Sequence, residues 1–384
     1  MHTLNALQVM FGTGALCGIG FYLLCAWSAF SYLRARSAGT IAKLESPPVS
    51  ILKPLRGTDP EMYESFRSHC RQDYPGYEII FGVSERDDPA VALVERLQRE
   101  FPACAIRLLV CSEILGSNVK VSNLVQMLPH ARHEFVLVND SDIRVPPGYL
   151  AGVMSPFSNP RVGLVTALYR GQAGPTLGSR LEALGISAEF MAGVLAARNI
   201  EAGLHFALGA TLALRREALL AIGGFEAVLD YLADDFELGA RVAAAGYEVA
   251  LADCVVETFV PAYSFRDFLD HQLRWGRSTR NSRSWGYFGL LLTFGLPWAI
   301  LATVFSRGAA WAWALLAAAL LSRLLMALMV GVKVIGDRQV LRYLWLLPLR
   351  DMVAVVVWIG SYTGRTVFWR GQRFILKDKK LRPA

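Results

Sequence analysis

The sequence predicts an α/β domain, a mixed sheet flanked by helices, with membrane-spanning helices at both ends of the chain. Between residues 49 and 138, short apolar runs typical of buried strands alternate with helical patterns, which favours parallel βαβ units in a doubly wound sheet. Uncharged or nearly uncharged apolar segments precede and follow this region. Of the 384 residues, 54% are hydrophobic and 18% are charged. The mean hydropathy of +0.35 is too high for an ordinary soluble protein, yet the chain is too charged to consist of spanning helices alone.

The first apolar segment, residues 9–30, contains no charge and is about long enough to cross a bilayer. It lacks the basic start and the short apolar core of a secretory signal peptide, so we expect a retained anchor. A buried core helix is the alternative. Basic residues follow this segment (Arg34, Arg36 and Lys43), which predicts that the chain emerges on the cytoplasmic side.

The next region is expected to form the first half of the sheet. We expect strands at residues 49–52, 77–83, 106–111 and 135–138, and helices at residues 60–72 and 90–100. The region 116–128, which contains Lys120 and Asn123, lies between the last two of these strands. No strand is followed by G-x-G-x-x-G, and G-x-x-x-x-G-K-[ST] is missing from the sequence. A dinucleotide enzyme and a P-loop nucleotidase are therefore disfavoured.

The second half combines further sheet elements with long helical patterns. We expect a strand at residues 162–167, a long apolar helix at 176–198, a return to the sheet at 203–214, a helix from 231 to about 245 and a basic helix at 264–283. Three apolar segments then follow, at residues 288–305, 309–332 and 345–362. Arg323 lies inside the second of these, which is costly unless it faces protein or water. The number of crossings and the side of the basic C-terminal tail stay open.

Two carboxylates, Asp140 and Asp142, directly follow the apolar run at 135–138. Functional groups gather at the carboxyl ends of strands in open α/β sheets, so this D-x-D pair is expected at the edge of the sheet. Two such carboxylates can share a hard cation that also binds a diphosphate. A solvated Asp-rich turn is the alternative. Asp234 and Asp235 begin a helix, where acidic residues also suit the helix dipole.

The formal net charge of +7 permits nucleic-acid binding, but many basic residues lie beside apolar segments. That placement suits anionic lipid headgroups better, so we expect a lipid bilayer and no nucleic acid as partner. The basic residues near the end are Arg365, Arg370, Arg373, Lys377, Lys379 and Lys380. The 6 cysteines form no C-x-x-C pair, which indicates neither a zinc site nor a disulfide framework. A reducing, cytosolic environment fits the main domain.

Several stretches together resemble a GT-A glycosyltransferase of the family-2 type, and most closely the ceramide glucosyltransferase family, family 21. They are VSILKPLRGTDP at 49–60, DYPGYEI at 73–79, DDPA at 87–90, DSDIRV at 140–145, ADDF at 233–236 and LRW at 273–275. The resemblance covers nearly the whole chain. Within the family, the chain is most similar to the bacterial hopanoid branch, the bacteriohopanetetrol N-acetylglucosaminyltransferases. The resemblance implies a GT-A catalytic domain, a Rossmann-like mixed sheet flanked by helices.

The resemblance also implies roles for individual residues. Asp88 matches the first family aspartate, expected at the uracil or ribose of the donor. Asp140 matches the second, and Asp142 completes a D-x-D motif for a divalent metal, Mg²⁺ or Mn²⁺. Asp235 matches the third, expected to be the catalytic base.

Arg274 and Trp275 match the end of the family's (Q/R)-x-x-R-W motif, whose first position is His271 here. We expect Arg274 at the pyrophosphate, and Trp275 at the acceptor site or in the core. Lys53, Lys120 and Asn123 are expected on the nucleotide side of the site, with a surface role as the alternative.

These residues predict an inverting, metal-dependent hexosyltransferase that moves a sugar from a UDP-sugar donor to a membrane lipid alcohol. UDP-N-acetylglucosamine and bacteriohopanetetrol are the favoured substrates, with UDP-glucose and ceramide as the near alternative. Transfer to a polyprenyl phosphate and a non-catalytic membrane scaffold with a decayed transferase domain stay open. We expect an integral protein of a bacterial inner membrane with a cytoplasmic catalytic domain. The expected parts are an anchor with its basic flank (1–45), the catalytic domain (46–262), an interfacial basic helix (263–287), and C-terminal membrane segments with a basic tail (288–384).

Overall fold

The computed structural model describes residues 2–38, 46–369 and 372–383. The chain divides into two units. The helical unit comprises Met1–Ala38, Ala173–Ile200 and Ala262–Leu376. The sheet unit comprises Gly39–Gln172, Glu201–Pro261 and Lys377–Ala384. Two of the basic residues named above, Lys43 and Arg370, lie outside the described residues.

The sheet unit contains one 8-stranded mixed sheet in the order β3-β2-β1-β4-β7-β6-β8-β5. Its strands are β1 Val49–Leu55, β2 Tyr77–Val83, β3 Ala105–Val110, β4 Phe135–Val138, β5 Ile143–Arg144, β6 Val162–Ala173, β7 Leu212–Arg215 and β8 Glu248–Val260. β1 pairs in parallel with β2 and β4, and β2 pairs in parallel with β3. The β4–β7, β6–β7 and β5–β8 pairs are antiparallel, so the second half of the sheet reverses direction. The mixed α/β fold is therefore confirmed.

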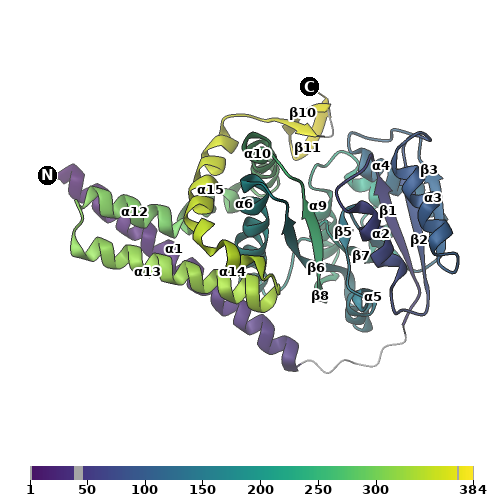
Figure 1. The fold of residues 1–384 in the computed structure, drawn as a ribbon, viewed down its shortest axis with the longest axis horizontal. Coiled ribbons are helices and arrows are strands. Elements are labelled where there is room, and N and C mark those ends of the chain that lie inside the picture. The colour runs from purple at the N-terminus through teal and green to yellow at the C-terminus, as the bar shows by residue number, and fades with distance from the viewer. Residues whose placement is uncertain (1, 39–45, 370–371, 384) are drawn as a thin grey trace. The chain divides into compact units, whose positions relative to one another are not determined.

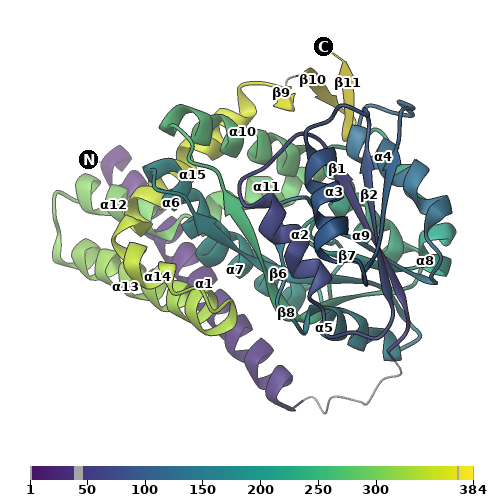
Figure 2. The ribbon, with the colours of Figure 1, turned by 45° about the vertical axis from the view of Figure 1, so that its right-hand side comes forward.

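Helices cover both faces of this sheet. They are α2 Met62–Cys70, α3 Ala90–Glu100, α4 Val119–Met127, α5 Tyr149–Met154, α8 Arg216–Ala221 and α9 Asp234–Ala244. α2 and α3 pack side by side against β1 and β2, where Phe66 and Val94 join the same buried core as Ile51 (Figure 2). α4 packs closely against β2 at Gly82. A Cβ added to this glycine would lie only 2.9 Å from Cγ of Met127 on α4.

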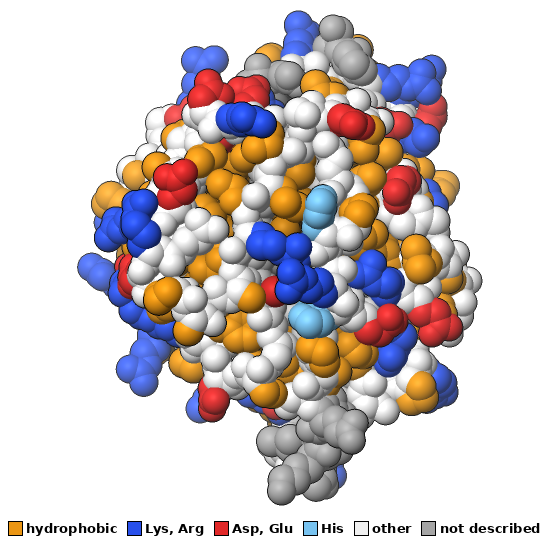
Figure 3. Space-filling view, turned by 90° about the vertical axis from the view of Figure 1, so that its right-hand side faces the viewer, with side chains coloured by type: hydrophobic (Ala, Val, Ile, Leu, Met, Phe, Trp, Pro, Cys, Tyr) orange, Lys and Arg blue, Asp and Glu red, His pale blue; other side chains and the backbone are white. Residues whose placement is uncertain are grey.

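The surface on the right-hand side of Figure 1 belongs to this unit. Figure 3 shows that basic side chains gather near the centre of this surface, beside histidine side chains, with acidic and hydrophobic side chains around them. The charge on this face is therefore mixed in sign.

The helical unit consists mainly of helices (Figure 1), several of them apolar. They are α1 His2–Ala38, α6 Leu177–Gly185, α7 Met191–Ile200, α10 Phe265–Ser282, α11 Ser284–Gly289, α12 Gly295–Phe305, α13 Ala310–Ala327, α14 Gln339–Tyr343 and α15 Leu347–Tyr362. Two π-helical segments, Ile186–Phe190 and Leu328–Val334, continue α6 and α13. β9 Thr366–Trp369 and β10 Gln372–Lys377 pair antiparallel near the end of the unit.

Among the described residues, 3 helical stretches are long and apolar enough to cross a membrane: Leu4–Ser37, Ala310–Val334 and Gln339–Tyr362. A pair of shorter helices, Ser284–Thr293 and Gly295–Phe305, is bent by 49° and would make a fourth crossing if it forms one span. The expected anchor and C-terminal apolar segments are thus present as helices. Whether the apolar segment at 288–305 crosses the membrane stays a prediction, because it belongs to this bent pair.

Other expectations differ from the structure in instructive ways. The predicted helix at 176–198 is present as a continuous helical run, but it contains a π-helical turn at Ile186–Phe190 that the sequence does not indicate. The long strand β8 is not among the predicted elements, although only its register with β5 places Thr258 beside the D-x-D turn. The last part of the basic tail forms a strand, β11 Lys380–Pro383, within the sheet unit. Its expected place at lipid headgroups stays a prediction.

Small residues bring the N-terminal helix close to α12. A Cβ on Gly18 would overlap the backbone of Gly295, and a Cβ on Gly295 would lie 2.9 Å from the carbonyl carbon of Gly18. Close backbone approach through glycine is a common way for helices to associate in lipid.

We expect Gly18→Val to separate α1 from α12, because the new side chain has no space between the two backbones. The variant should lower the thermal unfolding midpoint of the detergent-purified chain by several degrees. Gly20→Val is the matched control, because a Cβ at Gly20 meets nothing within 4 Å. Equal midpoints for the two variants would contradict the packing.

A buried ion pair links two other apolar segments of this unit. Arg323 of α13 is only 1% exposed, and its Nη2 lies 2.9 Å from Oδ1 of Asp351 in α15. Arg323 Nη1 also donates to the carbonyl oxygen of Ala188, at 3.1 Å. The sequence requires that this arginine face protein or water, and the structure shows that it faces protein.

Candidate active site

The turn after β4 is held in one conformation by buried hydrogen bonds. Asn139 is fully buried, and its Nδ2 donates to the carbonyl oxygen of Ala210 at 2.7 Å and to the hydroxyl of Tyr149 at 2.8 Å. Lys53 on β1 is also fully buried, and its Nζ donates to the carbonyl oxygen of Asp140 at 3.0 Å. These contacts fix the backbone from which Asp140 and Asp142 project.

Asp142 sits in a setting that disfavours its charged form. Its Oδ2 accepts a hydrogen bond from the hydroxyl of Thr258 on β8. Burial, followed by the charge of Asp140, raises the pKa of Asp142 to about 6. Two carboxylates this close repel each other, and a shared cation would relieve that repulsion.

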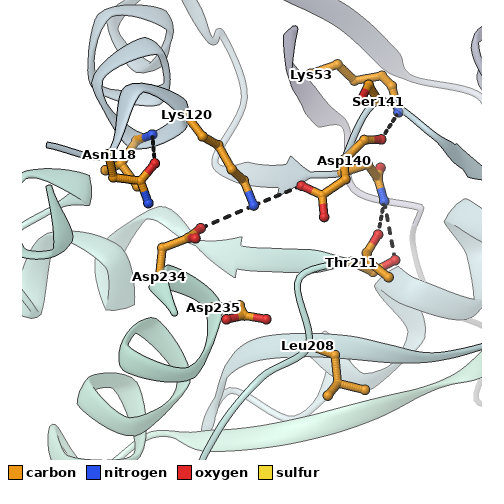
Figure 4. A network of polar contacts seen from close by, with 12 residues as sticks. Lys53, Asn118, Lys120, Asp140, Ser141, Leu208, Thr211, Asp234 and Asp235 are labelled. Atoms are coloured by element: carbon orange, nitrogen blue, oxygen red, sulfur yellow. Dashed lines mark hydrogen bonds and ion pairs between the residues drawn. The ribbon is translucent and has the colours of Figure 1, made fainter. Parts of the chain in front are cut away.

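Lys120 joins the D-x-D turn to the start of α9 (Figure 4). Its Nζ lies 2.9 Å from Oδ1 of Asp140 and 3.2 Å from Oδ2 of Asp234. Burial lowers the pKa of Lys120, but the two carboxylates outweigh it, so the pKa lies above its ordinary value and the ammonium stays charged. The Lys120 side chain is 17% exposed and that of Asp140 is 40% exposed, so the group is open to a ligand on the Asp140 side.

Asp235 lies next to this ammonium and close to Asp140 (Figure 4). A Cβ on Gly209 would lie 3.1 Å from Oδ2 of Asp235 and 3.5 Å from Oδ2 of Asp140, so both oxygens border the same glycine. Oδ1 of Asp235 accepts a hydrogen bond from the backbone N–H of Phe236 at 2.8 Å. Burial, then repulsion from Asp234, raises the pKa of Asp235 to about 6. A carboxylate with such a pKa is suited to accept a proton near neutral pH.

The other predicted donor-binding residues of the sheet unit come from three places: Lys53 on β1, Asp88 after β2 and Asn123 on α4. The carboxylate of Asp88 follows β2 and accepts from the backbone N–H of Gly57, at 2.9 Å, and of Ala90, at 2.9 Å. Asn123 of α4 is buried, and its Oδ1 accepts from the hydroxyl of Ser84 at 3.1 Å. Burial lowers the pKa of Lys53 to about 7, against the opposing charges of Asp142 and Asp140. That these residues contact the nucleotide stays a prediction.

Arg274 and Trp275 lie on α10, in the helical unit. The ring of Trp275 lies 5.0 Å from that of His271 and 6.2 Å from that of Phe190, measured between centroids. The expected roles of Arg274 at the pyrophosphate and of Trp275 at the acceptor stay predictions.

A short segment before α9, Leu229–Tyr231, connects both sides of the Lys120 group. The backbone N–H of Asn118, which caps α4, donates to Leu229 O at 2.8 Å, and Asn118 Nδ2 donates to Tyr231 O at 2.8 Å. Oδ1 of Asp230 accepts from the backbone N–H of Ser117 at 3.0 Å. The segment therefore fixes the helix start that presents Lys120 and leads directly into Asp234 and Asp235.

The last strand of the chain, β11, packs against this segment. The backbone N–H of Leu381 donates to Asp230 O at 2.6 Å, and Tyr231 forms an antiparallel bridge with Lys380. Leu381 is 2% exposed, and Nζ of Lys379 lies 3.4 Å from Oε1 of Glu237 on α9. The C-terminus thus takes part in the scaffold behind the acidic group.

Three contributors were not anticipated from the sequence: Asp234 as a partner of Lys120, Thr258 as a partner of Asp142, and β11. For Asp234 the adjacent-aspartate pattern was visible, but its position in the first helical turn has an equally good explanation through the helix dipole. Thr258 and β11 are more than 100 residues from their partners, and no local pattern indicates such pairings.

The mixed sheet, with acidic residues just after its strands, is typical of the GT-A fold. The mannosyltransferase PcManGT from Pyrobaculum calidifontis, in complex with GDP-mannose and Mn²⁺, is similar over 93% of this chain and 99% of that chain, with 20% sequence identity and a TM-score of 0.54. Residues 10–381 match the sequence model of glycosyl transferase family 21. The chain belongs to glycosyl transferase family 21.

Curated relatives carry names from the same family. Ceramide glucosyltransferase 3 of Caenorhabditis elegans is 28% identical over 249 residues, which cover 64% of this chain and 54% of the relative. A ceramide glucosyltransferase of Komagataella phaffii is 35% identical over 107 residues, 27% of this chain and 21% of the relative. The chain thus spans about half the length, or less, of these relatives.

Proposed function

We propose that this chain is an inverting, metal-dependent hexosyltransferase that moves a sugar from a UDP-sugar to an alcohol group of a membrane lipid. The observation that supports it most is the convergence of Asp140, Asp234 and Asp235 around Lys120 at the carboxyl end of β4. Membership of glycosyl transferase family 21 and the apolar helices of the helical unit support the transferase and the lipid acceptor respectively.

Asp235 is the proposed base. It takes the proton from the acceptor hydroxyl as the hydroxyl oxygen forms a bond to the anomeric carbon of the sugar. The bond from that carbon to the diphosphate oxygen breaks in the same step, and UDP leaves with the electron pair. One displacement without an enzyme nucleophile inverts the configuration at the anomeric carbon. Lys120, already charged and beside Asp140, is placed to attract the diphosphate.

The carboxylates of the site suit a divalent cation that is bound partly by the protein and partly by the substrate. Among the described residues, no three His, Cys, Asp or Glu side chains are grouped to hold a metal ion by themselves. Mg²⁺ in nucleotide enzymes commonly takes one or two carboxylates and completes its shell with phosphate and water. Asp140 and Asp142 would hold such an ion; burial, followed by the charge of Asp140, raises the pKa of Asp142. The ion would stabilise the negative charge of the departing diphosphate.

The substrates can be narrowed by the family relatives and by the sequence. UDP-N-acetylglucosamine and bacteriohopanetetrol are the favoured pair on overall sequence likeness. UDP-glucose and ceramide are the second candidate, favoured by the names of the curated relatives. In either case we infer a cytoplasmic active site, a bacterial inner membrane location and access for the lipid between the helices of residues 176–198 and 265–283.

The test uses the full chain in lipid nanodiscs with Mg²⁺ or Mn²⁺. Radiolabelled UDP-N-acetylglucosamine and UDP-glucose are each offered with bacteriohopanetetrol, ceramide and a polyprenyl phosphate. We expect a lipid product with a β-anomeric linkage by NMR from an α-linked donor. An α-linked product would overturn the inverting mechanism, a mild-acid-labile product would identify the polyprenyl phosphate as acceptor, and no product from any pair would favour a non-catalytic scaffold.

The pKa of Asp235 predicts an acidic limit to activity. A base acts only when deprotonated, so kcat/KM should be level above pH 6 and fall about tenfold per pH unit below it. Asp234→Asn removes the like charge that helps to raise this pKa, so the fall should begin at a lower pH. The check is the pH profile of kcat/KM for both proteins. An acidic limb at the same pH in both would contradict the coupling between the two aspartates.

A further inference from the structure

A second polar group lies inside the helical unit, among apolar helices. Glu182 of α6 is 4% exposed, Gln272 of α10 is 6% exposed and Arg350 of α15 is 7% exposed. Leu181, Leu184 and Val353 of the same helices pack into one buried apolar cluster. Ionisable groups in such surroundings are costly, and they commonly mark sites of function in membrane-embedded proteins.

Most of the hydrogen-bonding capacity of this group is used internally. Oε2 of Glu182 lies 2.8 Å from Nδ1 of His271 and accepts from Nε2 of Gln272 at 3.3 Å. Oε1 of Gln272 accepts from Nη2 of Arg350 at 3.1 Å. The same Nη2 forms an ion pair with Oε2 of Glu189, at 3.3 Å. Glu189 belongs to the π-helical turn that joins α6 to α7. Such turns occur frequently at functional sites.

Part of that capacity is unused. Within the described part of the chain, Nη1 of Arg350 has no hydrogen-bond partner, and Oε2 of Glu189 has only its ion pair with Arg350. Nε of Arg350 also lacks a hydrogen-bond partner among the described residues, but it faces Gly185. A buried donor without a partner is rare and destabilising, so such groups indicate a missing partner. The missing partner must present an oxygen to the guanidinium and can present an O–H to the carboxylate. A hydroxyl group does both.

We propose that Arg350 and Glu189 form a head-group subsite in the helical unit that binds a polar oxygen of the lipid acceptor, with Glu182 and Gln272 holding the subsite in place. This rests on the proposed function. The chemical class is a lipid with a further hydroxyl or amide oxygen near its primary alcohol, a feature shared by ceramide and a hopanoid polyol. Phe190, which is 41% exposed, and the half-buried Trp275 lie beside the group and offer apolar contact to the lipid chain.

Glycine makes a precise test available. A Cβ on Gly185 would lie 2.8 Å from Nη2 and 3.0 Å from Cζ of Arg350, so Gly185→Ala displaces the guanidinium without removing its charge. Gly193→Ala on α7 is the matched control, because a Cβ there meets nothing within 4 Å. Arg350→Gln is a second variant that removes the charged donor itself.

The experiment measures lipid binding without a sugar donor, so it does not depend on turnover. Native mass spectrometry of the detergent-purified full chain is run with ceramide, bacteriohopanetetrol and hexadecanol, which has only a primary hydroxyl. We expect the wild-type chain and Gly193→Ala to retain ceramide or bacteriohopanetetrol at least tenfold more tightly than hexadecanol. Gly185→Ala and Arg350→Gln should lose most of that preference.

The subsite is wrong if the wild-type chain binds hexadecanol as tightly as both polar lipids. It is also wrong if Gly185→Ala and Arg350→Gln keep the wild-type preference, even if they unfold at a lower temperature, since that result would identify a purely structural network. Failure of sugar transfer by the wild-type chain, with the lipid preference intact, would overturn the proposed reaction and leave the binding site in place.

Discussion

Asp235→Asn is expected to lower kcat by about 10²–10⁴-fold, the range by which a positioned general base accelerates a reaction. Asparagine has nearly the same shape and keeps an oxygen that can accept from the N–H of Phe236, but it cannot take a proton from the acceptor. Binding of the UDP-sugar should change little, because the substitution leaves Lys120, Asp140 and Asp142 in place. Transfer assays in nanodiscs and donor binding by calorimetry provide the two measurements.

Asp73→Asn is the control for that experiment, because Asp73 is exposed and lies outside the acidic group. It should retain wild-type kcat. A kcat for Asp235→Asn within a factor of two of wild type, in a chain with an unchanged unfolding midpoint, would remove Asp235 from the proposed mechanism.

The largest expected effect on stability comes from breaking the ion pair between α13 and α15. Asp351→Leu leaves the guanidinium of Arg323, which is 1% exposed, without its carboxylate partner. Removing one member of a buried pair typically costs about 3–5 kcal/mol, because the remaining charge stays buried. We expect a large fall in the unfolding midpoint of the purified chain, measured by intrinsic fluorescence during heating.

The double variant Arg323→Met/Asp351→Leu tests whether the charge itself causes this loss. Replacing both members of a buried pair by apolar residues is often neutral or stabilising. We therefore expect the double variant to recover most of the lost stability. If the double variant were as unstable as Asp351→Leu, lost packing at Asp351 would be the cause, and the ion pair would contribute little.

Much of the sheet could be predicted because its signals are local. The apolar runs of β1, β2 and β4 identify buried strands, and the amphipathic pattern of residues 90–100 coincides with α3. The polar break after β4 likewise identifies the turn with Asp140 and Asp142. These features depend on neighbours within a few residues, so the sequence displays them directly.

The rest depends on contacts between distant residues. β8 is 13 residues long but only some of its positions are buried, so it lacks the continuous apolar run of a central strand. The ion pairs of Lys120 arise only because α4 and α9 start at the same end of the sheet. Asp140, Asp142, Asp235 and Lys120 can be named from the sequence, whereas the contacts that Lys120 makes with two carboxylates and that Thr258 makes with Asp142 cannot.

The position of β11 has a practical consequence for anyone who purifies this protein. The backbone N–H of Leu381 donates to the carbonyl oxygen of Asp230, and Asp230 lies four residues before Asp234. A tag that disturbs residues 380–383 would therefore disturb a strand that packs against the segment leading into the acidic group. Tagged preparations with weak turnover should therefore be compared with protein released from its tag, or tagged elsewhere, before a low rate is attributed to the enzyme.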